Sequence, residues 1–464
     1  MKFLYILIAI LILLIMITVH EFGHYIVGKL FKFKINEFAI GMGPALLKKT
    51  KKNGEIFSIR AFPLGGFCAF EGEDEDNENP NAFNNKKPWQ RILVLIAGAT
   101  MNFILALFII IITFSCYGKA VYQVVEVHDN PSYTQVLQDG DGLLEINGRK
   151  IFLSTDLIKS VDGLSAGDTV KVKVLRNGKE ITETLTLQHN ANAKNSSDMA
   201  SFLKAIGVAT FTEFSVVDES KSPFSSGDYL LYFSLDGTKD KSKLVRVYNE
   251  KELIERLIYK NLEKTIENTI GDTITFYTQN LNDWTPNNSE IVNLSESITI
   301  TLPHNWEGIK YNDNLLKTEF GFETSFYLRL SSFKYKAPFF TRLGESFVYS
   351  FKIGGTILET LGELLTGKLS LNSVGGPITT IKTTSQVVSY GFEYILEIIA
   401  FIGVNLAVFN LLPIPALDGS RVIFTTIEWI FKKPVPKKVE AIIHGVGLVL
   451  LLGFSIMVDI LQFF

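Results

Sequence analysis

The sequence predicts a polytopic α-helical membrane protein with four spans, combined with β-rich segments. Hydrophobic residues make up 47% of its 464 residues, and the mean hydropathy is +0.22. Four predominantly apolar stretches each approach the roughly 20 residues that a helix needs to cross a bilayer. Between the second and third stretches lies a long region with β-type alternation. The chain is also too long for one ordinary soluble domain.

The first predicted span begins with residues 3–19, which carry no charge and run directly into the motif HEFGH. A secretory signal peptide is the alternative reading of such a stretch. However, no small-residue cleavage site follows, and cleavage would separate the motif from the segment beside it. The other spans are predicted at about 92–117, 394–412 and 441–463.

The basic residues predict how the spans are oriented. Lysines and arginines are frequent between spans one and two, and again at 432–438 between spans three and four. Both of these loops should therefore be cytoplasmic. The segment at about 118–390 and both termini are then expected outside. The net charge of −3 and the absence of any nucleic-acid-binding motif argue against a nucleic-acid partner.

His20, Glu21 and His24 form an H-E-x-x-H motif at the end of the first apolar stretch. On a helix, residues four apart share one face, so both imidazoles can bind one metal. Two neutral histidines suit zinc, and Glu21 can act as general base toward a water that zinc activates. An ionisable residue inside a span costs about 2.5–3.5 kcal/mol on insertion scales, which favours a functional role over coincidence.

A catalytic zinc usually has three protein ligands, so one more is expected elsewhere in the chain. Asp418 is the better candidate because it follows the third span, at the same cytoplasmic depth as the histidines. The alternative is a structural role, in which Asp418 only caps a helix before Gly419. His444, near the start of the fourth span, remains a weaker candidate. The remaining histidines lie in the predicted external segment: His128, His189 and His304.

Several sequence blocks resemble, in order, the site-2 protease family of intramembrane zinc metalloproteases, and most closely the bacterial type that regulates sigma-E with tandem PDZ domains. The likeness covers nearly the whole chain. The blocks are HEFGHYIVGKLFKFKINEFAIGMGP, FPLGGFCAFEGE, PWQRILVLIAGATMNFILA, SVGGPI and NLAVFNLLPIPALDGSRVIF. The chain departs from the family pattern at Ala99, where the family has proline, and at Ser420, where it has glycine.

The resemblance implies specific roles for residues of this chain. His20, His24 and Asp418 would bind zinc, and Glu21 would be the catalytic base. Substrate-handling positions are implied at Asn405, Asn410, Pro413, Pro415, Gly65, Gly66 and Phe67.

Residues 35–70 carry short β-like runs with glycines, and these predict a small sheet that dips into the membrane beside the zinc. FPLGGFCAFEGE resembles the membrane-reentrant loop of the family. An exposed sheet edge there could add an extended substrate strand through hydrogen bonds. An ordinary turn at Gly65 and Gly66 is the alternative. The acidic stretch at 71–78 is read as a solvated loop, with a charge gate as the alternative.

The external segment contains a stretch, NPSYTQVLQDGDGLLEINGRKI, that resembles a PDZ domain, and Asn177-Gly178 predicts a hairpin. Residues 222–237 resemble a divergent second copy, with an insertion around 279–296. Generic β-domains are the alternative for both. Apolar residues at helical spacing in 339–369 predict an amphipathic helix on the outer membrane surface.

These observations predict a domain order along the chain. The segments are 1–34 (first span with HExxH), 35–90 (reentrant β region and loop), 91–117 (second span), 118–195 (PDZ-like domain 1), 196–335 (PDZ-like domain 2), 336–390 (membrane-surface helix region), 391–430 (third span with the Asn/Pro/LDG motif) and 431–464 (cytoplasmic loop and fourth span).

The expected function is zinc-dependent endopeptidase cleavage inside the spans of single-span membrane proteins, in a bacterial inner membrane. The resemblance implies pre-cleaved anti-sigma factors and remnant signal peptides as substrates. Two alternatives come from other classes of protein. A non-catalytic membrane scaffold would have no need of Glu21, and a metal transporter would not explain the large external modules.

Overall fold

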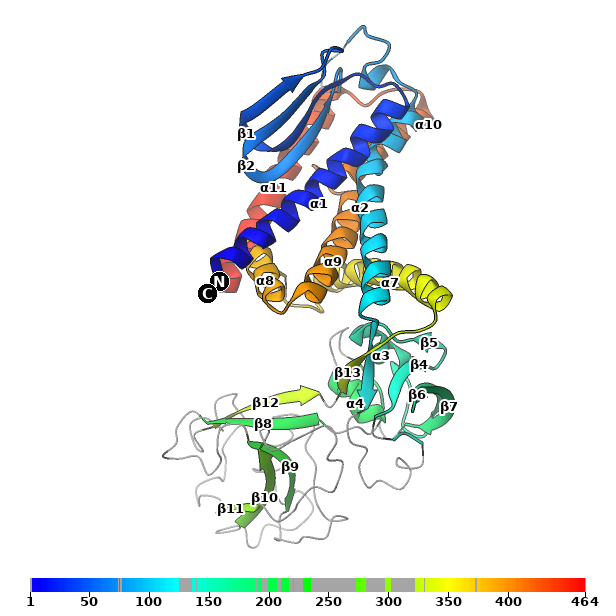
Figure 1. The fold of residues 1–464 in the computed structure, drawn as a ribbon, viewed down its shortest axis with the longest axis vertical. Coiled ribbons are helices and arrows are strands. Elements are labelled where there is room, and N and C mark those ends of the chain that lie inside the picture. The colour runs from blue at the N-terminus through cyan, green and yellow to red at the C-terminus, as the bar shows by residue number, and fades with distance from the viewer. Residues whose placement is uncertain are drawn as a thin grey trace. The chain divides into compact units, whose positions relative to one another are not determined.

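The computed structural model describes residues 2–73, 75, 77–124, 136–138, 140–187, 190–193, 199–206, 210–216, 220, 228–234, 273–280, 297–301, 322–328, 330–371 and 374–463. The chain divides into two compact units (Figure 1). We call Met1–Lys119 together with Tyr335–Phe464 the membrane unit, and Ala120–Lys334 the β unit.

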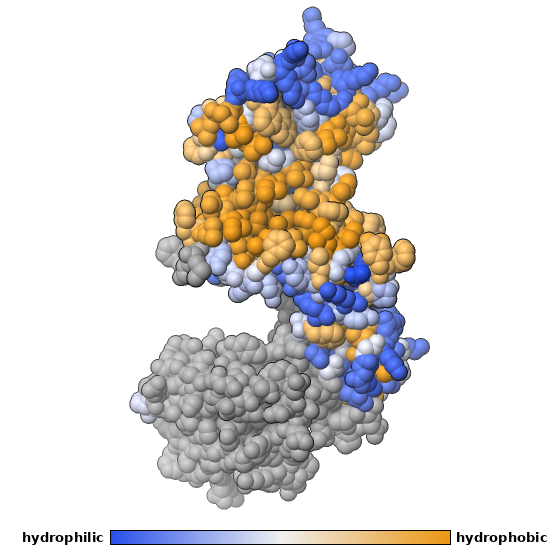
Figure 2. Space-filling view, viewed as in Figure 1, coloured by the Kyte–Doolittle hydropathy of each residue, from blue (hydrophilic) through white to orange (hydrophobic). Residues whose placement is uncertain are grey.

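Four helices of the membrane unit are long and apolar enough to cross a bilayer, which confirms the four predicted spans. Only 11–44% of the most apolar window of each helix is buried, so most of that surface faces outward. On the face shown in Figure 2, apolar side chains form a broad band across the membrane unit. The helices are α1 (Lys2–Leu30), α2 (Pro88–Cys116), α9 (Phe392–Leu411) and α11 (Lys437–Phe463).

α1 is longer than its apolar run, because it continues unbroken through the HEFGH motif to Leu30. The motif is therefore helical, as predicted. α9 ends at Leu411, just before Pro413 and Pro415, which cannot supply the backbone N–H groups that a helix needs. A new helix, α10, then begins at Asp418.

The described residues of the membrane unit also form three shorter helical elements and one long helix: η1 (Phe83–Asn85), α8 (Pro377–Ser389), α10 (Asp418–Phe431) and the long α7 (Phe339–Leu365). α7 forms within the stretch 339–369 for which a helix was predicted. The N-terminus of α8 is bound by Asp459 of α11, whose carboxylate accepts bonds from the backbone N–H groups of Ile378 (2.9 Å) and Thr379 (3.0 Å). These bonds satisfy two amides that an isolated helix would leave unpaired.

The spans pack through small and branched side chains. Ala106 and Ile110 of α2 meet Val404 of α9 and Ile353 of α7 in one buried cluster. Gly403 lets α9 approach α2 closely, because a Cβ at this position would lie 2.9 Å from the Cβ of Ala106. This contact fixes α2 and α9 against each other next to α1.

Strands β1 (Ile35–Thr50) and β2 (Ile56–Phe70) form an antiparallel sheet in the predicted region, but they are long and bent rather than short. Phe38 pairs with both Cys68 and Phe57, and the same holds across residues 37–40, each of which has a β2 partner on both sides. Residues 66–70 pair with β1 on one side only. Positive φ angles at Gly41 (84°) and Gly65 (90°) permit the bends.

Among its described residues, the β unit has two sheets and two short helices. Its larger sheet has the strand order β13-β3-β4-β6-β7, with β5 beside β4, and the second has the order β11-β10-β9-β8-β12. A buried core including Leu143, Val172, Leu157 and Phe202 joins the larger sheet to α3 and α4. The elements are β3 (Lys119–Val124), β4 (Gly142–Ile146), β5 (Arg149–Lys150), α3 (Ser154–Val161), β6 (Thr169–Arg176), β7 (Lys179–Thr186), α4 (Met199–Ile206), β8 (Thr210–Val216), β9 (Asp228–Ser234), β10 (Thr273–Asn280), β11 (Ser297–Thr301), β12 (Phe322–Leu328) and β13 (Leu330–Tyr335).

The hairpin predicted at Asn177-Gly178 is present, since β6 and β7 pair from Arg176 and Lys179 outward. Most of the stretch 222–237, which resembles a second PDZ copy, lies outside the described residues, as does most of the insertion at 279–296.

Candidate metal centre

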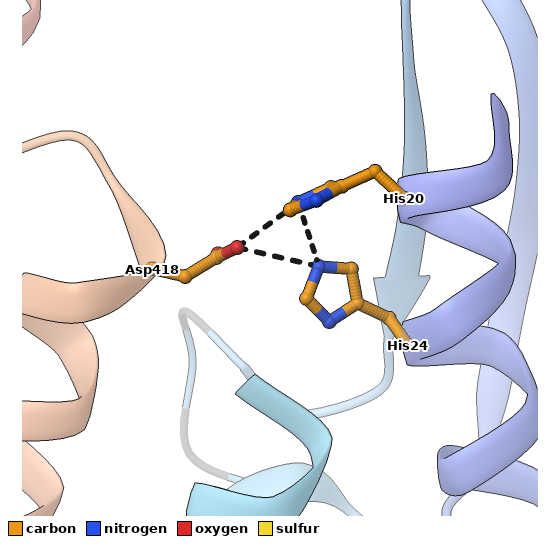
Figure 3. A group of neighbouring side chains, drawn as sticks. All are labelled: His20, His24 and Asp418. Atoms are coloured by element: carbon orange, nitrogen blue, oxygen red, sulfur yellow. Dashed lines mark hydrogen bonds and ion pairs between the residues drawn. The ribbon is translucent and has the colours of Figure 1, made fainter. Parts of the chain in front are cut away.

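The two histidines of the motif lie one turn apart on α1 and present their rings to a common point (Figure 3). Both residues are only 8% exposed. The two Nε2 atoms are 3.1 Å apart, and the ring planes are nearly perpendicular at 82°. The helical spacing therefore delivers two nitrogen donors to one place, as predicted.

Asp418 supplies a third donor from the first residue of α10. Its Oδ2 lies 3.0 Å from Nε2 of His20 and 3.4 Å from Nε2 of His24. Tetrahedral zinc with bonds of about 2.0–2.1 Å separates its ligand atoms by about 3.3 Å. The three side chains are thus spaced as zinc requires, and they are the group of potential metal ligands found among the described residues.

Second contacts orient both imidazoles. The Nδ1–H of His24 donates to the carbonyl oxygen of Val94 on α2, at 2.8 Å. This bond leaves Nε2 free for a metal. The side-chain amide of Asn410 lies 3.4 Å from Nδ1 of His20. An amide can present either its nitrogen or its oxygen, so Asn410 can accept the Nδ1–H of a metal-binding His20.

Two glycines explain how α1 and α2 come close enough to build this centre. A Cβ on Gly98 of α2 would lie 2.5 Å from Nε2 of His24 and 2.7 Å from Cε1 of His20. A Cβ on Gly23 of α1 would overlap the carbonyl of Ala97. Gly98 therefore leaves the space that the two rings fill, and Gly23 lets the backbone of α2 approach α1.

Glu21 lies between the metal centre and strand β2. A Cβ on Gly66 would be 3.5 Å from Cγ of Glu21, so the outer segment of the sheet passes directly beside this carboxylate. The backbone N–H of Cys68 also interacts with Glu21. Glu21 and the extended strand beside it therefore lie on the same side of the three potential metal ligands.

Two cavities meet at the centre, and His20, Glu21 and Asp418 line both. The first, of about 320 Å³, is completed by Asn102 of α2, by the end of α9 including Asn410, and by the loop that precedes Asp418. The second, of about 300 Å³, is lined by β2, including Phe67. The donors and Glu21 are therefore accessible from two sides.

The other residues predicted to handle substrate take different positions. Gly65 has φ of +90° and lies at the bend before Gly66. Pro415 packs against Gly447 of α11, where a Cβ would overlap it. The side-chain oxygen of Asn405 is buried without a hydrogen-bond partner among the described residues. Nothing that the structure describes gives Pro413 a contact with the donors.

His444, the weaker ligand candidate, contributes to the site in another way. Its Nδ1 accepts a hydrogen bond from the backbone N–H of Ala416, at 3.0 Å, and its ring packs edge-on against Phe424. It thereby supports the loop that carries Asp418. In the acidic stretch, Glu73 forms an ion pair with Arg421 of α10, so this residue is not simply solvated.

Sequence reasoning overlooked Asn102, Gly98 and the carbonyl of Val94, all on α2. An asparagine four residues after a glycine in an apolar span was the available signal, because both lie on one helix face. Only the packing of α1 on α2 shows that this face of α2 meets the metal centre.

Comparisons with known proteins agree with this geometry. A model described as peptidase family M50 matches residues 8–454. A predicted zinc metalloprotease of Fusobacterium nucleatum is 27% identical over 459 residues, which span 98% of this chain and 97% of that protein. The regulator of sigma-E protease of Salmonella typhimurium is 27% identical over 463 residues, 96% of each chain. The corresponding protein of Haemophilus influenzae is 25% identical over 465 residues, 95% of this chain and 94% of its own.

The family match includes the helix that carries the two histidines, the sheet beside Glu21 and the start of α10 at Asp418. It confirms the resemblance that the sequence blocks indicated. The chain belongs to peptidase family M50, the site-2 protease family, and is a membrane metalloprotease.

Proposed function

We propose that this protein is a zinc-dependent endopeptidase that hydrolyses peptide bonds within the spans of single-span membrane proteins. Anti-sigma factors already trimmed by another protease, and remnant signal peptides, are the proposed substrates. The observation that carries the proposal is the convergence of His20, His24 and Asp418 at 3.0–3.4 Å, with Glu21 lining the same two cavities.

His20, His24 and Asp418 would hold the zinc. The zinc would polarise the scissile carbonyl and lower the pKa of a water toward neutrality. Glu21 takes the proton from the attacking water and later delivers it to the leaving nitrogen. Val94 and Asn410 hold the two imidazoles in orientation through the contacts at Nδ1.

The outer strand segment at 66–70 supports a mode of substrate binding. A helical substrate hides its peptide bonds, so it must be extended before cleavage. Residues 66–70 pair with β1 on one side and pass beside Glu21. An extended substrate that added to this edge would place its backbone next to the base. We propose that Gly65, Gly66 and Phe67 act in this way in a reentrant loop.

We further propose a bacterial inner-membrane location with the metal centre near the cytoplasmic side. The basic loops support this orientation, with the β unit and both termini outside. The β unit would contain two PDZ-like domains that act as a size filter and exclude substrates still carrying bulky outer domains. The amphipathic pattern of α7 supports a place on the outer membrane surface.

The first experiment compares the wild type with Glu21→Gln on a tagged single-span substrate in detergent, with zinc measured for both. The wild type is expected to cleave and to hold about one zinc per chain, as three protein ligands imply. Glu21→Gln is expected to keep the zinc and lose cleavage, because it removes the base and none of the donors.

The outcomes separate this proposal from its rivals. A scaffold or a metal transporter would show no cleavage in the wild type that depends on Glu21. A wild type without zinc would refute the assignment of His20, His24 and Asp418. Asp418→Ala serves as the loss-of-metal control in the same assay.

A further inference from the structure

Asn102, in the middle of α2, is a polar side chain without a structural explanation. The residue is 0% exposed. Neither its Nδ2 nor its Oδ1 has a hydrogen-bond partner among the residues that the structure describes. Leaving a buried amide unpaired costs about 1–3 kcal/mol, and a membrane span offers little water to relieve that cost.

Three threonines of the spans are satisfied locally, in contrast to Asn102. Thr18, Thr100 and Thr113 each donate to the carbonyl oxygen four residues earlier in the same helix, at 2.7–2.9 Å. These threonines need no outside partner. Asn102 differs because both its donor groups and its acceptor remain available.

The position of Asn102 shows where a partner would lie. It lines the 320 Å³ cavity together with His20, Glu21 and Asp418. It is one turn from Gly98, against which the two imidazoles rest. Its backbone carbonyl would lie 3.2 Å from a Cβ on Gly403, so α9 packs closely on this turn. A firmly held amide thus borders the space that contains the base and the metal donors.

We propose that Asn102 is a catalytic residue whose Nδ2–H donates to the carbonyl oxygen of the scissile peptide. This inference rests on the function proposed above. The oxygen of the attacking water bonds to the carbonyl carbon, and Glu21 accepts the released proton. The π-electron pair moves onto the carbonyl oxygen, where the Asn102 amide stabilises the negative charge.

Completion of the reaction restores the amide to its starting state. The electron pair on the oxygen re-forms the carbonyl, the carbon–nitrogen bond breaks, and Glu21 gives its proton to the nitrogen. One peptide and one water yield one carboxyl and one amine. In the substrate-free protein the Nδ2–H of Asn102 is thus an unpaired donor already in position. It can stabilise the negative charge that develops on the carbonyl oxygen during the reaction.

The test compares Asn102→Leu with the wild type on the tagged single-span substrate. Loss of one such donor should lower kcat by about 10²–10³-fold, with KM nearly unchanged because the bond forms mainly in the transition state. Zinc content should stay at the wild-type value. The midpoint of thermal unfolding should stay equal or rise, because an unpaired buried amide has been replaced by an apolar side chain of similar size.

Matched variants make the result specific. Thr113→Val removes a buried hydroxyl from the same helix and should leave kcat unchanged. Asn102→Ser keeps a shorter donor, should lose less activity than Asn102→Leu, and decides the question if the leucine variant does not fold. In the Glu21→Gln background, Asn102→Leu should leave binding of the uncleaved substrate unchanged.

Two results would overturn the inference. The first is an unchanged kcat in Asn102→Leu. The second is a lower kcat together with lost zinc or a lower unfolding midpoint, because that combination indicates a structural role. Failure of the proposed function is a different result: the wild type itself would then not cleave the substrate, and the inference would fail with it.

Discussion

At Gly98, a missing side chain shapes the metal centre as much as the donors do. The two imidazoles occupy the space that a Cβ would take, at 2.5 Å from Nε2 of His24 and 2.7 Å from Cε1 of His20. A helix tolerates alanine better than glycine by about 1 kcal/mol. The glycine is therefore unfavourable for α2 alone and is explained by its contact with α1.

Gly98→Ala should weaken zinc binding, because the new methyl group must push the two rings apart. Support of metal ligands is typically worth about 10–100-fold in affinity, and a loss of that size is expected. Zinc retention against increasing chelator measures it. Gly445→Ala is the matched control, since nothing lies within 4 Å of a Cβ at that helical position. Equal zinc affinity in both variants would contradict the prediction.

The sequence was sufficient to predict that His20, His24 and Asp418 lie together, with Glu21 at the same site, because HExxH spacing and the Asp418 block are local patterns. Their roles as metal ligands and base stay predictions. The sequence was not sufficient for Asn102 or Gly98. Their roles depend on which face of α2 meets α1, and an apolar span with few polar residues does not reveal that face. The predicted roles of Asn405, Pro413 and Pro415 stay predictions.

At the scale of elements, Glu55 joins α1, the helix that carries the two histidines, to the sheet. It lies in the turn between β1 and β2, and its side chain is 2% exposed. Its carboxylate forms an ion pair with Lys29 in the last turn of α1, and it accepts bonds from Lys51 (2.7 Å) and Tyr25 (2.8 Å). Burial alone would raise the pKa of Glu55, but these partners together lower it to about 2.

Because the folded-state pKa of Glu55 lies below its ordinary value of 4.5, its contribution is complete above pH 4.5 and is lost as the pH falls toward 2. Glu55→Gln should lower the free energy of unfolding by about 1–3 kcal/mol at pH 7. The difference from the wild type should shrink between pH 4.5 and 2. Thermal unfolding of the zinc-free protein in chelator measures both effects. A pH-independent difference would contradict this assignment.

The helices were more predictable than the strands. A long apolar run specifies a membrane helix by itself, since every backbone bond is made inside the segment. The β1–β2 sheet depends on bends at Gly41 and Gly65 and on pairing across both sides of residues 37–40. Short β runs were therefore predicted where two long bent strands form.

At the scale of the whole molecule, the β unit is inserted at one place in the membrane unit. The chain leaves at Lys119 and returns at Tyr335. A Cβ on Gly118 would lie 2.7 Å from the carbonyl oxygen of Tyr335, so the two ends of the insertion are neighbours. The membrane unit can therefore be closed by a short linker.

Replacing residues 120–334 with a short glycine linker should preserve zinc binding, because all three donors belong to the membrane unit. If the β unit filters by size, the shortened protein should cleave single-span substrates that still carry intact outer domains, which the full chain rejects. Cleavage of matched long and short substrates measures this. A shortened protein that binds zinc, cuts the short substrate and leaves the long one intact would contradict the size filter.

His20 and Asp418 are 398 residues apart in the sequence, and that separation matters while the protein is being made. Synthesis at about 5–20 residues per second leaves roughly 20–80 seconds between the emergence of the first donor and the last. During that interval the nascent chain contains His20, Glu21 and His24 but not yet Asp418. If Asp418 is the third metal ligand, as proposed, a chain whose translation stops before residue 418 has an incomplete ligand set and should have no protease activity.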